Sequence, residues 1–310
     1  MAVKPQMTMD AGLNFLISQL SHVEQKVFEK KYENINYNKV IPTTNEAGEY
    51  ADSITYFYMD GAAMAKFVGS NSLDVPIAEI ATKKVTIPVE YGAVGYEYSL
   101  RELEQAAALN KPLPVMKAGV ARRGYEQLVQ ITAMKGDDKK GLPGFLNNVN
   151  VPLSSVANGV NGTSDWASKS ANEILKDINT MFSTVFESTK MVERPDTLAL
   201  PPKQWSYIMG TPRSANSDTT IAQYVVNNSP YIDSIDKIIP INELTGAGVG
   251  GTDRAMAYTN DSDKVVLHLP KLLSFKAPQE KGLGFVVPGD FTVGGVEFRY
   301  PMSALYADGI

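Results

Sequence analysis

The sequence predicts an α+β fold in which an N-terminal helix and an extended β-hairpin precede the main globular part. Three observations support this prediction. Residues 11–31 have apolar side chains at helical spacing, residues 46–98 contain two long strand-like stretches, and residues 99–136 have the pattern of two helices. Helices and short strands then follow to the C-terminus, which is typical of an α+β arrangement.

The composition is that of a globular protein, and it excludes several kinds of chemistry. The chain has 310 residues, 44% hydrophobic and 20% charged, and this length suggests about two domains. There is no cysteine, so disulfides, thiolate metal sites and cysteine nucleophiles are excluded. No apolar run is long enough for a membrane helix or a secretory signal. We therefore expect a soluble protein made in the cytoplasm, with no membrane partner.

The charge does not indicate a dedicated nucleic-acid-binding protein. The net charge is -5, and basic residues are adjacent only in pairs. Nucleic-acid-binding domains usually carry a basic patch or stripe. Any contact with DNA is therefore expected to be weak and non-specific.

The first predicted element is an amphipathic helix over residues 11–31, capped by Asp10. Its apolar stripe contains Leu13, Leu16 and Leu20. A helix so close to the start of the sequence must pack on something, either its own domain or, as an arm, a neighbouring molecule. The pattern alone leaves both alternatives open.

The second predicted element is the hairpin, whose strands are apolar on both faces. The alternation from Val85 predicts a half-buried strand, and Pro88 favours an edge or a bulge. The alternation changes phase after Gly92, which predicts a bulge near Gly92 or Gly95. A hairpin with two apolar faces needs partners beyond its own domain. The interface residues expected from this argument are Tyr56, Phe57, Tyr58, Met59, Phe67, Val85, Ile87 and Val89.

Helices are predicted next. Ser99 and Glu102 form a capping box for a helix to about residue 109. A longer helix follows to about residue 134, in which Gly119 and Gly124 permit the close approach of a neighbour. Another capping box, Ser170 with Glu173, opens a helix to about residue 189. The remaining predicted elements are strands at 197–200, 235–241, 255–259, 265–269 and 284–300 and helical stretches at 204–209 and 219–227.

The sequence has few candidates for catalysis or cofactor binding. Residues 246–251 spell the glycine fingerprint of dinucleotide-binding proteins, but a strand-like stretch follows where a helix is needed, so a mobile loop is expected instead. His22 and His268 have no metal-ligating residue at the usual spacing. Asp137 and Asp138 are expected in a solvated turn. We therefore predict no enzyme activity, no cofactor and no metal.

Four stretches, taken in order, resemble the Hong Kong 97 (HK97) fold of tailed-bacteriophage major capsid proteins. They are residues 141–147 (GLPGFLN), 195–202 (PDTLALPP), 294–301 (GGVEFRYP) and 306–310 (YADGI). The resemblance implies an N-terminal arm at 1–45, an extended loop at 46–98, a spine helix with the first part of a peripheral domain at 99–195, an axial domain at 196–270 and return strands of the peripheral domain at 271–310. It also implies that Gly246, Gly248 and Gly251 belong to an axial loop.

The resemblance further implies a structural subunit that assembles with copies of itself into hexamers and pentamers of an icosahedral shell around the genome. Leu13, Leu16 and Leu20 of the arm would then contact neighbours. Scaffolding, portal and decoration proteins are possible partners, and any scaffold is expected to be a separate chain. The location would be the virion, after assembly in the host cytoplasm. The alternatives are an encapsulin-type nanocompartment shell, a two-domain enzyme and a phage tail or adhesion protein.

Overall fold

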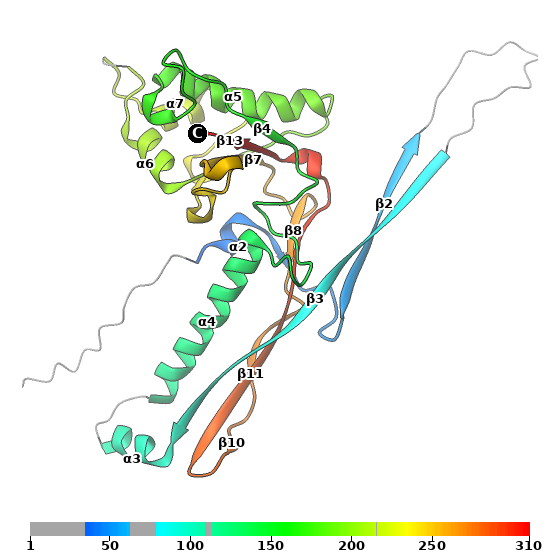
Figure 1. Cartoon of the computed structure of the whole chain (residues 1–310), viewed down its shortest axis with the longest axis vertical. Coiled ribbons are helices and arrows are strands. Elements are labelled where there is room, and N and C mark those ends of the chain that lie inside the picture. The colour runs from blue at the N-terminus through cyan, green and yellow to red at the C-terminus, as the bar shows by residue number, and fades with distance from the viewer. Residues whose placement is uncertain (1–34, 63–78, 109–112, 215) are drawn as a thin grey trace, which may run out of the picture. The chain divides into compact units, whose positions relative to one another are not determined.

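The computed structural model describes residues 35–62, 79–108, 113–214 and 216–310, drawn as coloured ribbon in Figure 1. The predicted N-terminal helix with Leu13, Leu16 and Leu20 lies outside the described residues, and so does Phe67. Residues 35–310 form one compact unit.

The predicted hairpin is present. Strand β2 (Ser53–Ala62) runs antiparallel to the first half of β3 (Glu79–Ser99), from Ser53 opposite Pro88 to Ala62 opposite Glu79. Both strands are rich in β-branched and aromatic residues, which pack well on a pleated surface. The hairpin projects away from the other described elements (Figure 1).

The second half of β3 pairs with a different strand. Residues 89–99 pair with β11 (Gly284–Gly294), which lies on the opposite edge of β3 from β2. Strand β11 also pairs with β9 (Lys271–Phe275) and β10 (Gln279–Glu280). Pro88 directly precedes the first residue of β3 that pairs with β11. The Val89 N–H points to the β2 side, where it donates to Asp52. Since successive backbone nitrogens point to opposite edges of a strand, the Pro88 nitrogen faces the other edge, which is unpaired at this position. Its missing N–H therefore costs no ladder hydrogen bond.

The bulge predicted near Gly92 or Gly95 is absent, because the register between β3 and β11 is continuous through both glycines. The phase of the alternation changes for another reason. In the first half of β3, the odd-numbered residues such as Val85 and Ile87 face the rest of the chain. In the second half the even-numbered residues do so, on the face where Phe291 packs on Tyr125. Gly92 leaves room for Phe291, since a Cβ on Gly92 would lie 2.4 Å from that ring.

Helices α3 (Leu100–Ala108) and α4 (Leu113–Lys135) follow β3. The capping box predicted for α3 is confirmed, because the Glu102 N–H donates to Ser99 Oγ (3.2 Å) and the Ser99 N–H donates to Glu102 Oε2 (3.0 Å). The described residues contain two hydrophobic cores. One side of α4 is buried in the first core, together with the short helix α2 (Tyr37–Val40) and residues of β8 (Val265–His268), β11 and β12 (Val296–Phe298). The α4 residues on this side are Tyr125, Val129, Ala133 and Met134.

A second core lies around a five-stranded sheet of order β4-β13-β7-β5-β6. The helices packed with this core are α5 (Ala171–Ser188), α6 (Pro202–Gly210) and α7 (Ile221–Asn228). The strands are β4 (Leu153–Ser155), β13 (Leu305–Asp308), β7 (Arg254–Tyr258), β5 (Thr197–Leu200) and β6 (Ile238–Pro240). A third sheet contains β1 (Thr43–Thr44), β8 (Val265–His268) and β12 (Val296–Phe298).

Most predicted elements after residue 150 are confirmed to within a few residues. The exception is 235–241, where only Ile238–Pro240 is a strand. Ile235–Lys237 is a 3-10 turn instead, because the Ser234 side chain accepts from the Asp236 N–H and caps it. The other 3-10 turns are Trp166–Ser168, Asn242–Leu244, Val249–Gly251 and Pro301–Ser303. None of the helices within the described part of the chain is long and apolar enough to cross a membrane.

Candidate assembly surfaces

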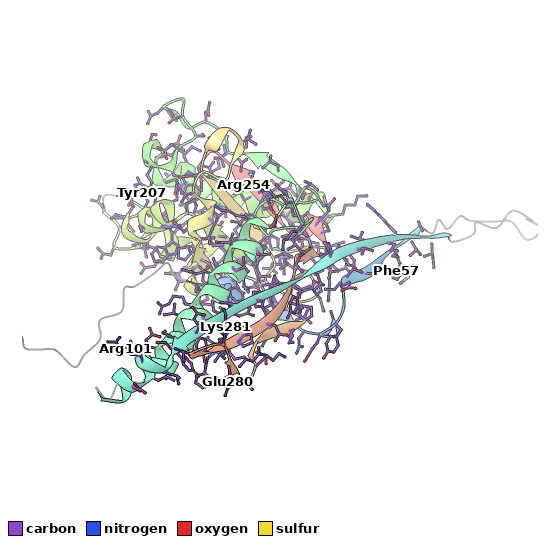
Figure 2. The ribbon with its side chains drawn as sticks, turned by 60° about the horizontal axis from the view of Figure 1, so that its bottom comes forward. Phe57, Arg101, Tyr207, Arg254, Glu280 and Lys281 are labelled. Carbon is purple, nitrogen blue, oxygen red and sulfur yellow. The ribbon has the colours of Figure 1, made fainter. Side chains whose placement is uncertain are left out.

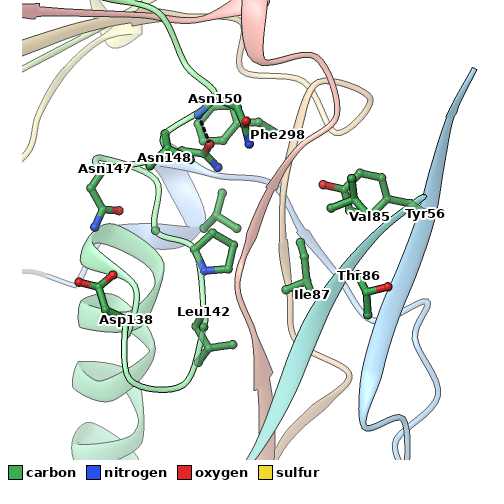
Figure 3. A pocket seen from close by; sticks show the side chains of 15 residues that line it. Tyr56, Val85, Thr86, Ile87, Asp138, Leu142, Asn147, Asn148, Asn150 and Phe298 are labelled. Atoms are coloured by element: carbon green, nitrogen blue, oxygen red, sulfur yellow. Dashed lines mark hydrogen bonds between the residues drawn. The ribbon is translucent and has the colours of Figure 1, made fainter. Parts of the chain in front are cut away.

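The register of the hairpin assigns its side chains to two faces. Tyr56 lies opposite Val85, and Ile54 lies opposite Ile87, so these four side chains share one face, here called the inner face. Figure 3 shows that the inner face meets the turn after α4 across a pocket of about 310 Å³, lined also by Leu142 and Phe298. Ile87 is only 4% exposed there. Of the predicted interface residues, Tyr56, Val85 and Ile87 therefore line a pocket within their own chain, and its burial leaves Ile87 unavailable to a neighbour.

The turn after α4 is a rigid base for the hairpin. The last four carbonyls of a helix need partners. Gly136, directly after α4, donates to Thr132, and the returning chain supplies the other three: Phe145 N–H to Ala133, Leu146 N–H to Met134, and the Asn147 side chain to Lys135. Gly136 has a left-handed backbone with φ of 70°. In the GLPG motif at 141–144, Gly141 also has φ of 70°, and a Cβ on Gly144 would lie 2.5 Å from the Gly136 nitrogen, so close backbone packing at the end of α4 explains both glycines.

The other face of the hairpin carries exposed apolar side chains. Phe57 is 63% exposed, Met59 76% and Ile80 72%, and the register places all three on the same face. These three residues are here called the outer hairpin stripe; Figure 2 shows Phe57 on the projecting hairpin. Phe57 and Met59 were predicted from the sequence. Ile80 was missed, because only the register reveals that it faces the same way as Met59. The Tyr58 side chain is outside the described atoms, and Val89 is half-buried.

A second exposed apolar stripe lies on α4. Met116, Val120, Leu128 and Ile131 are between 39% and 60% exposed, and Gly124 lies between them. These five residues are here called the α4 stripe. The sequence indicated only mixed faces for this helix, because its buried and exposed sides are both apolar.

The glycine-rich loop is held in place by two aspartates. The Gly246 N–H donates to Asp253 Oδ1 (2.9 Å), and the Val249 N–H donates to Asp308 Oδ2 (2.8 Å). Gly248 packs so closely on Thr252 that a Cβ would lie 2.5 Å from its hydroxyl. Strand β7, not a helix, follows the loop, so the loop cannot offer a helix N-terminus to a pyrophosphate. The predicted loop is confirmed, and hydrogen bonds to Asp253 and Asp308 anchor its base.

A buried ion pair with two parallel hydrogen bonds joins Arg254 to Asp308. The guanidinium donates from Nε to Oδ1 (2.6 Å) and from Nη2 to Oδ2 (2.9 Å), and Nη1 donates to the Leu146 carbonyl (2.7 Å). Both side chains are buried. Because Asp308 also accepts from the Val249 N–H, this pair ties the glycine-rich loop, strand β13 and the turn after α4 together.

The other polar candidates have structural roles. His268 Nε2 lies 2.7 Å from Glu297 Oε2, and both are buried between the strands of the third sheet. His22 lies outside the described residues. Asp137 accepts from the Lys139 N–H in a turn. No group of three metal-ligating side chains occurs in the parts of the chain that the structure describes.

Four carboxylates of the described residues, Glu102, Glu173, Asp233 and Asp290, have a lowered pKa. The pKa of Glu173 is lowered to about 2 by hydrogen bonds from the Ser170 hydroxyl and from the Val160 and Ser170 N–H groups. The pKa of Asp290 is lowered, first by its hydrogen bond from Lys271. The partners of these two carboxylates also fix local structure, since Glu173 caps α5 and Asp290 pairs with Lys271.

The fold and its surfaces define a class of protein: a structural subunit with two exposed apolar stripes and no catalytic constellation among its described residues.

The comparisons with known proteins agree with this class. A family profile described as major capsid protein matches residues 63–310. The capsid of Myoviridae phage XM1 is 19% identical to this chain, and the match covers 94% of this chain and 98% of the phage chain with a TM-score of 0.79. The capsid of a native GTA particle is 11% identical to this chain, the match covers 99% of each of the two chains, and the TM-score is 0.65. For Mycobacterium phage Ogopogo the identity is 9%, the coverage 93% and 96%, and the TM-score 0.60. No curated protein sequence matches the chain.

The chain belongs to the major capsid protein family. Its fold is the HK97-like fold, and the resemblance to tailed-phage major capsid proteins is confirmed. The protein is a structural subunit of an icosahedral capsid that assembles with copies of itself, and it is not an enzyme. Its location is the virion capsid. The encapsulin-type alternative is not favoured.

Proposed function

We propose that the outer hairpin stripe forms the contact through which one subunit of the shell holds the next. The observation that carries this proposal is that Phe57, Met59 and Ile80 are all more than 60% exposed on one face of a projecting hairpin. Contiguous exposed apolar side chains of this kind mark interaction surfaces. Burial of apolar area contributes about 25 cal/mol per Å² before ordering costs. Many such contacts in a closed shell add up to a stable particle.

The division of the chain into functional parts follows from the same proposal. Residues 1–45 would be the arm, with Leu13, Leu16 and Leu20 in contacts with neighbours, and 46–98 the extended loop. Residues 99–195 with 271–310 would make the peripheral domain, and 196–270 the axial domain. The support for an axial loop around Gly246, Gly248 and Gly251 is that Val249 at its tip is exposed while its base is fixed.

The finer functions follow from the family. Hexamers and pentamers would enclose the genome, and DNA would be contacted weakly, since the net charge is -5. Assembly would take place in the host cytoplasm, with scaffolding, portal and decoration proteins as further partners.

The hairpin contact is tested by placing a charge on the stripe. In Phe57→Asp and Met59→Asp the fold should persist, because both side chains are exposed in the subunit, but assembly into shells should be lost. Val160→Asp is the matched control, since Val160 is 95% exposed on a loop away from the hairpin. Sedimentation velocity measures the particle fraction. Normal shells from both hairpin variants would contradict the proposal.

A further inference from the structure

The two edges of the five-stranded sheet are protected to different extents. At the β6 edge, the backbone groups of Ile238 and Pro240 face away from β5. The Trp205 indole N–H donates to the Ile238 carbonyl (3.0 Å), and the Asn36 side chain donates to the next outward carbonyl, that of Pro240 (3.2 Å). The Ile238 N–H donates to the Ile235 carbonyl, and Pro240 has no N–H. This edge therefore offers nothing to a further strand.

The β4 edge lacks such protection. The Tyr306 N–H donates to the Pro152 carbonyl (2.9 Å), so the even-numbered residues of this stretch bond to β13. Because successive residues of a strand point their backbone groups to opposite edges, those of Leu153 and Ser155 point away from β13. Nothing in the described part of the chain pairs with them, and both residues are exposed. This edge is free to receive one more strand.

A groove of about 590 Å³ lies beside the free edge. It is lined by β4 and the loop after it, by β13 and by α5, which Figure 1 labels close together. Ser154 of β4 is paired with Ala307 of β13, so both side chains lie on the face of the sheet that lines the groove. A strand added to β4 would place every second side chain on this same face. The groove is the space in which those side chains would lie.

The lining of the groove favours apolar, uncharged side chains. Lys169 donates to Asp177 Oδ2 (2.6 Å) and to the Ala157 carbonyl (2.7 Å), and Glu173 accepts from backbone N–H groups of its own chain. The fourth charged residue of the lining, Lys176, is exposed to solvent. The buried hydrophobic residues of the lining are Met181, Leu305 and Ala307. An occupant with alternate apolar residues therefore matches the groove.

The sheet of a second copy does not supply this strand in a ring of subunits. Neighbours in a ring meet through different surfaces, so the β4 edge of one copy would have to meet the β6 edge of the next, and the β6 edge is closed. Pairing of β4 with β4 needs a twofold axis between the two copies. A strand from a different protein has neither restriction.

We propose that the free edge of β4 binds an extended segment of a different protein, which adds a strand to the sheet and places alternate apolar side chains in the groove beside α5. In this mode of recognition, main-chain hydrogen bonds to Leu153 and Ser155 give affinity, and the groove gives specificity. Because Lys169 already binds the Ala157 carbonyl, the free edge ends there and a short segment fills it. This inference goes beyond the hairpin contact and does not depend on it.

A peptide probe tests the edge. A fluorescent peptide, Lys-Val-Thr-Val-Thr-Val-Lys, is added to shells of the full chain, and the peptide that pellets with them is measured. Ser155→Pro should weaken binding at least about tenfold, because it removes an outward N–H that β13 does not use. Ser155→Ala is the matched control and should bind as wild type does.

The same peptide with prolines at its third and fourth positions should not pellet, because prolines cannot donate to the edge. Absence of binding of the first peptide to wild-type shells, or equal binding by Ser155→Pro and Ser155→Ala, would overturn the proposal.

A pair of α5 variants tests the groove. Thr180 and Asn179 are both exposed on this helix, but only Thr180 lines the groove. Thr180→Trp should fill the groove and weaken peptide binding at least about tenfold, whereas Asn179→Trp should change it less than about twofold. Both variants should melt close to the wild-type temperature. Equal binding by the two would overturn the proposal.

Hydrogen exchange identifies the kind of occupant. The Leu153 and Ser155 amides should exchange as fast in shells without peptide as in the unassembled subunit, and the peptide should slow both. Protection of these amides by assembly alone would mean that a second copy covers β4, which would overturn the proposal. The same holds if Ser155→Pro folds but no longer forms shells while Ser155→Ala does.

Discussion

At the scale of single residues, the buried Arg254–Asp308 pair connects the two cores. Arg254 donates to the Leu146 carbonyl beside the first core, and Asp308 ends a strand of the second. Asp308 lies in the YADGI stretch at 306–310, but Arg254 belongs to no motif and 54 positions separate the two residues, so nothing in the sequence indicated the contact. Both are buried, and every oxygen of the carboxylate has a donor. A buried pair of this kind contributes mainly through the cost of breaking it.

Asp308→Ala should lower the free energy of unfolding by about 3–5 kcal/mol, because it leaves the Arg254 guanidinium buried without its counter-charge. Urea denaturation of the unassembled subunit measures the change. Asp263→Ala, at an exposed turn position, should change stability by less than about 0.5 kcal/mol. A loss below about 1 kcal/mol in Asp308→Ala would show that the pair is not important for stability.

Glu173 gives a test that depends on pH. Its pKa is about 2 in the folded chain, below the ordinary 4.5, so its stabilising contribution is complete above pH 4.5 and is lost as the pH falls toward 2. Glu173→Ala should therefore melt at a lower temperature than wild type at pH 7, and the difference should shrink across this window. Glu173→Gln cannot ionise, and its own melting should lack this component. A wild-type advantage that is the same at pH 2 and pH 7 would contradict the assignment.

At the scale of elements, local signals predicted the helices well. Both capping boxes, Ser99 with Glu102 and Ser170 with Glu173, form as expected because each depends on residues only three positions apart. Strand partners were harder to predict. The exchange of partners along β3 produced the phase change that suggested a bulge, because pairing with β11 involves residues about 190 positions away.

The end of α4 is an element whose geometry the glycines fix. Gly136→Ala should destabilise the subunit by at least about 2 kcal/mol, because φ is 70° and the new Cβ would lie 2.4 Å from the Leu142 carbonyl oxygen.

Thermal unfolding of the unassembled subunit measures this effect. Gly119→Ala is the comparison, since it lies within α4 in open space and should stabilise by about 0.5–1 kcal/mol. Equal effects of the two changes would mean that the tight turn is not required.

At the scale of the whole molecule, the sequence supported the capsid fold through the order of its elements more than through any motif. The arm cannot be compared with the structure, because residues 1–34 lie outside the described chain. The apolar character of the hairpin was visible in the sequence, but which face is free was not. That required the register of β2 on β3 and the burial of Ile87 beside the turn after α4. The α4 stripe was hidden because the helix is apolar on both sides.

The central claim is that the projecting part of the hairpin builds the shell and is not needed for the subunit to fold. Electron microscopy of a chain in which Asn-Gly replaces residues 57–84 tests it most directly. This two-residue turn joins the paired Tyr56 and Val85, retains the inner face and removes the outer hairpin stripe. We expect the shortened chain to be folded by circular dichroism and to show no shells in electron micrographs. The wild-type chain, prepared in the same way, should show closed shells. Closed shells from the shortened chain, or an unfolded subunit, would contradict the account.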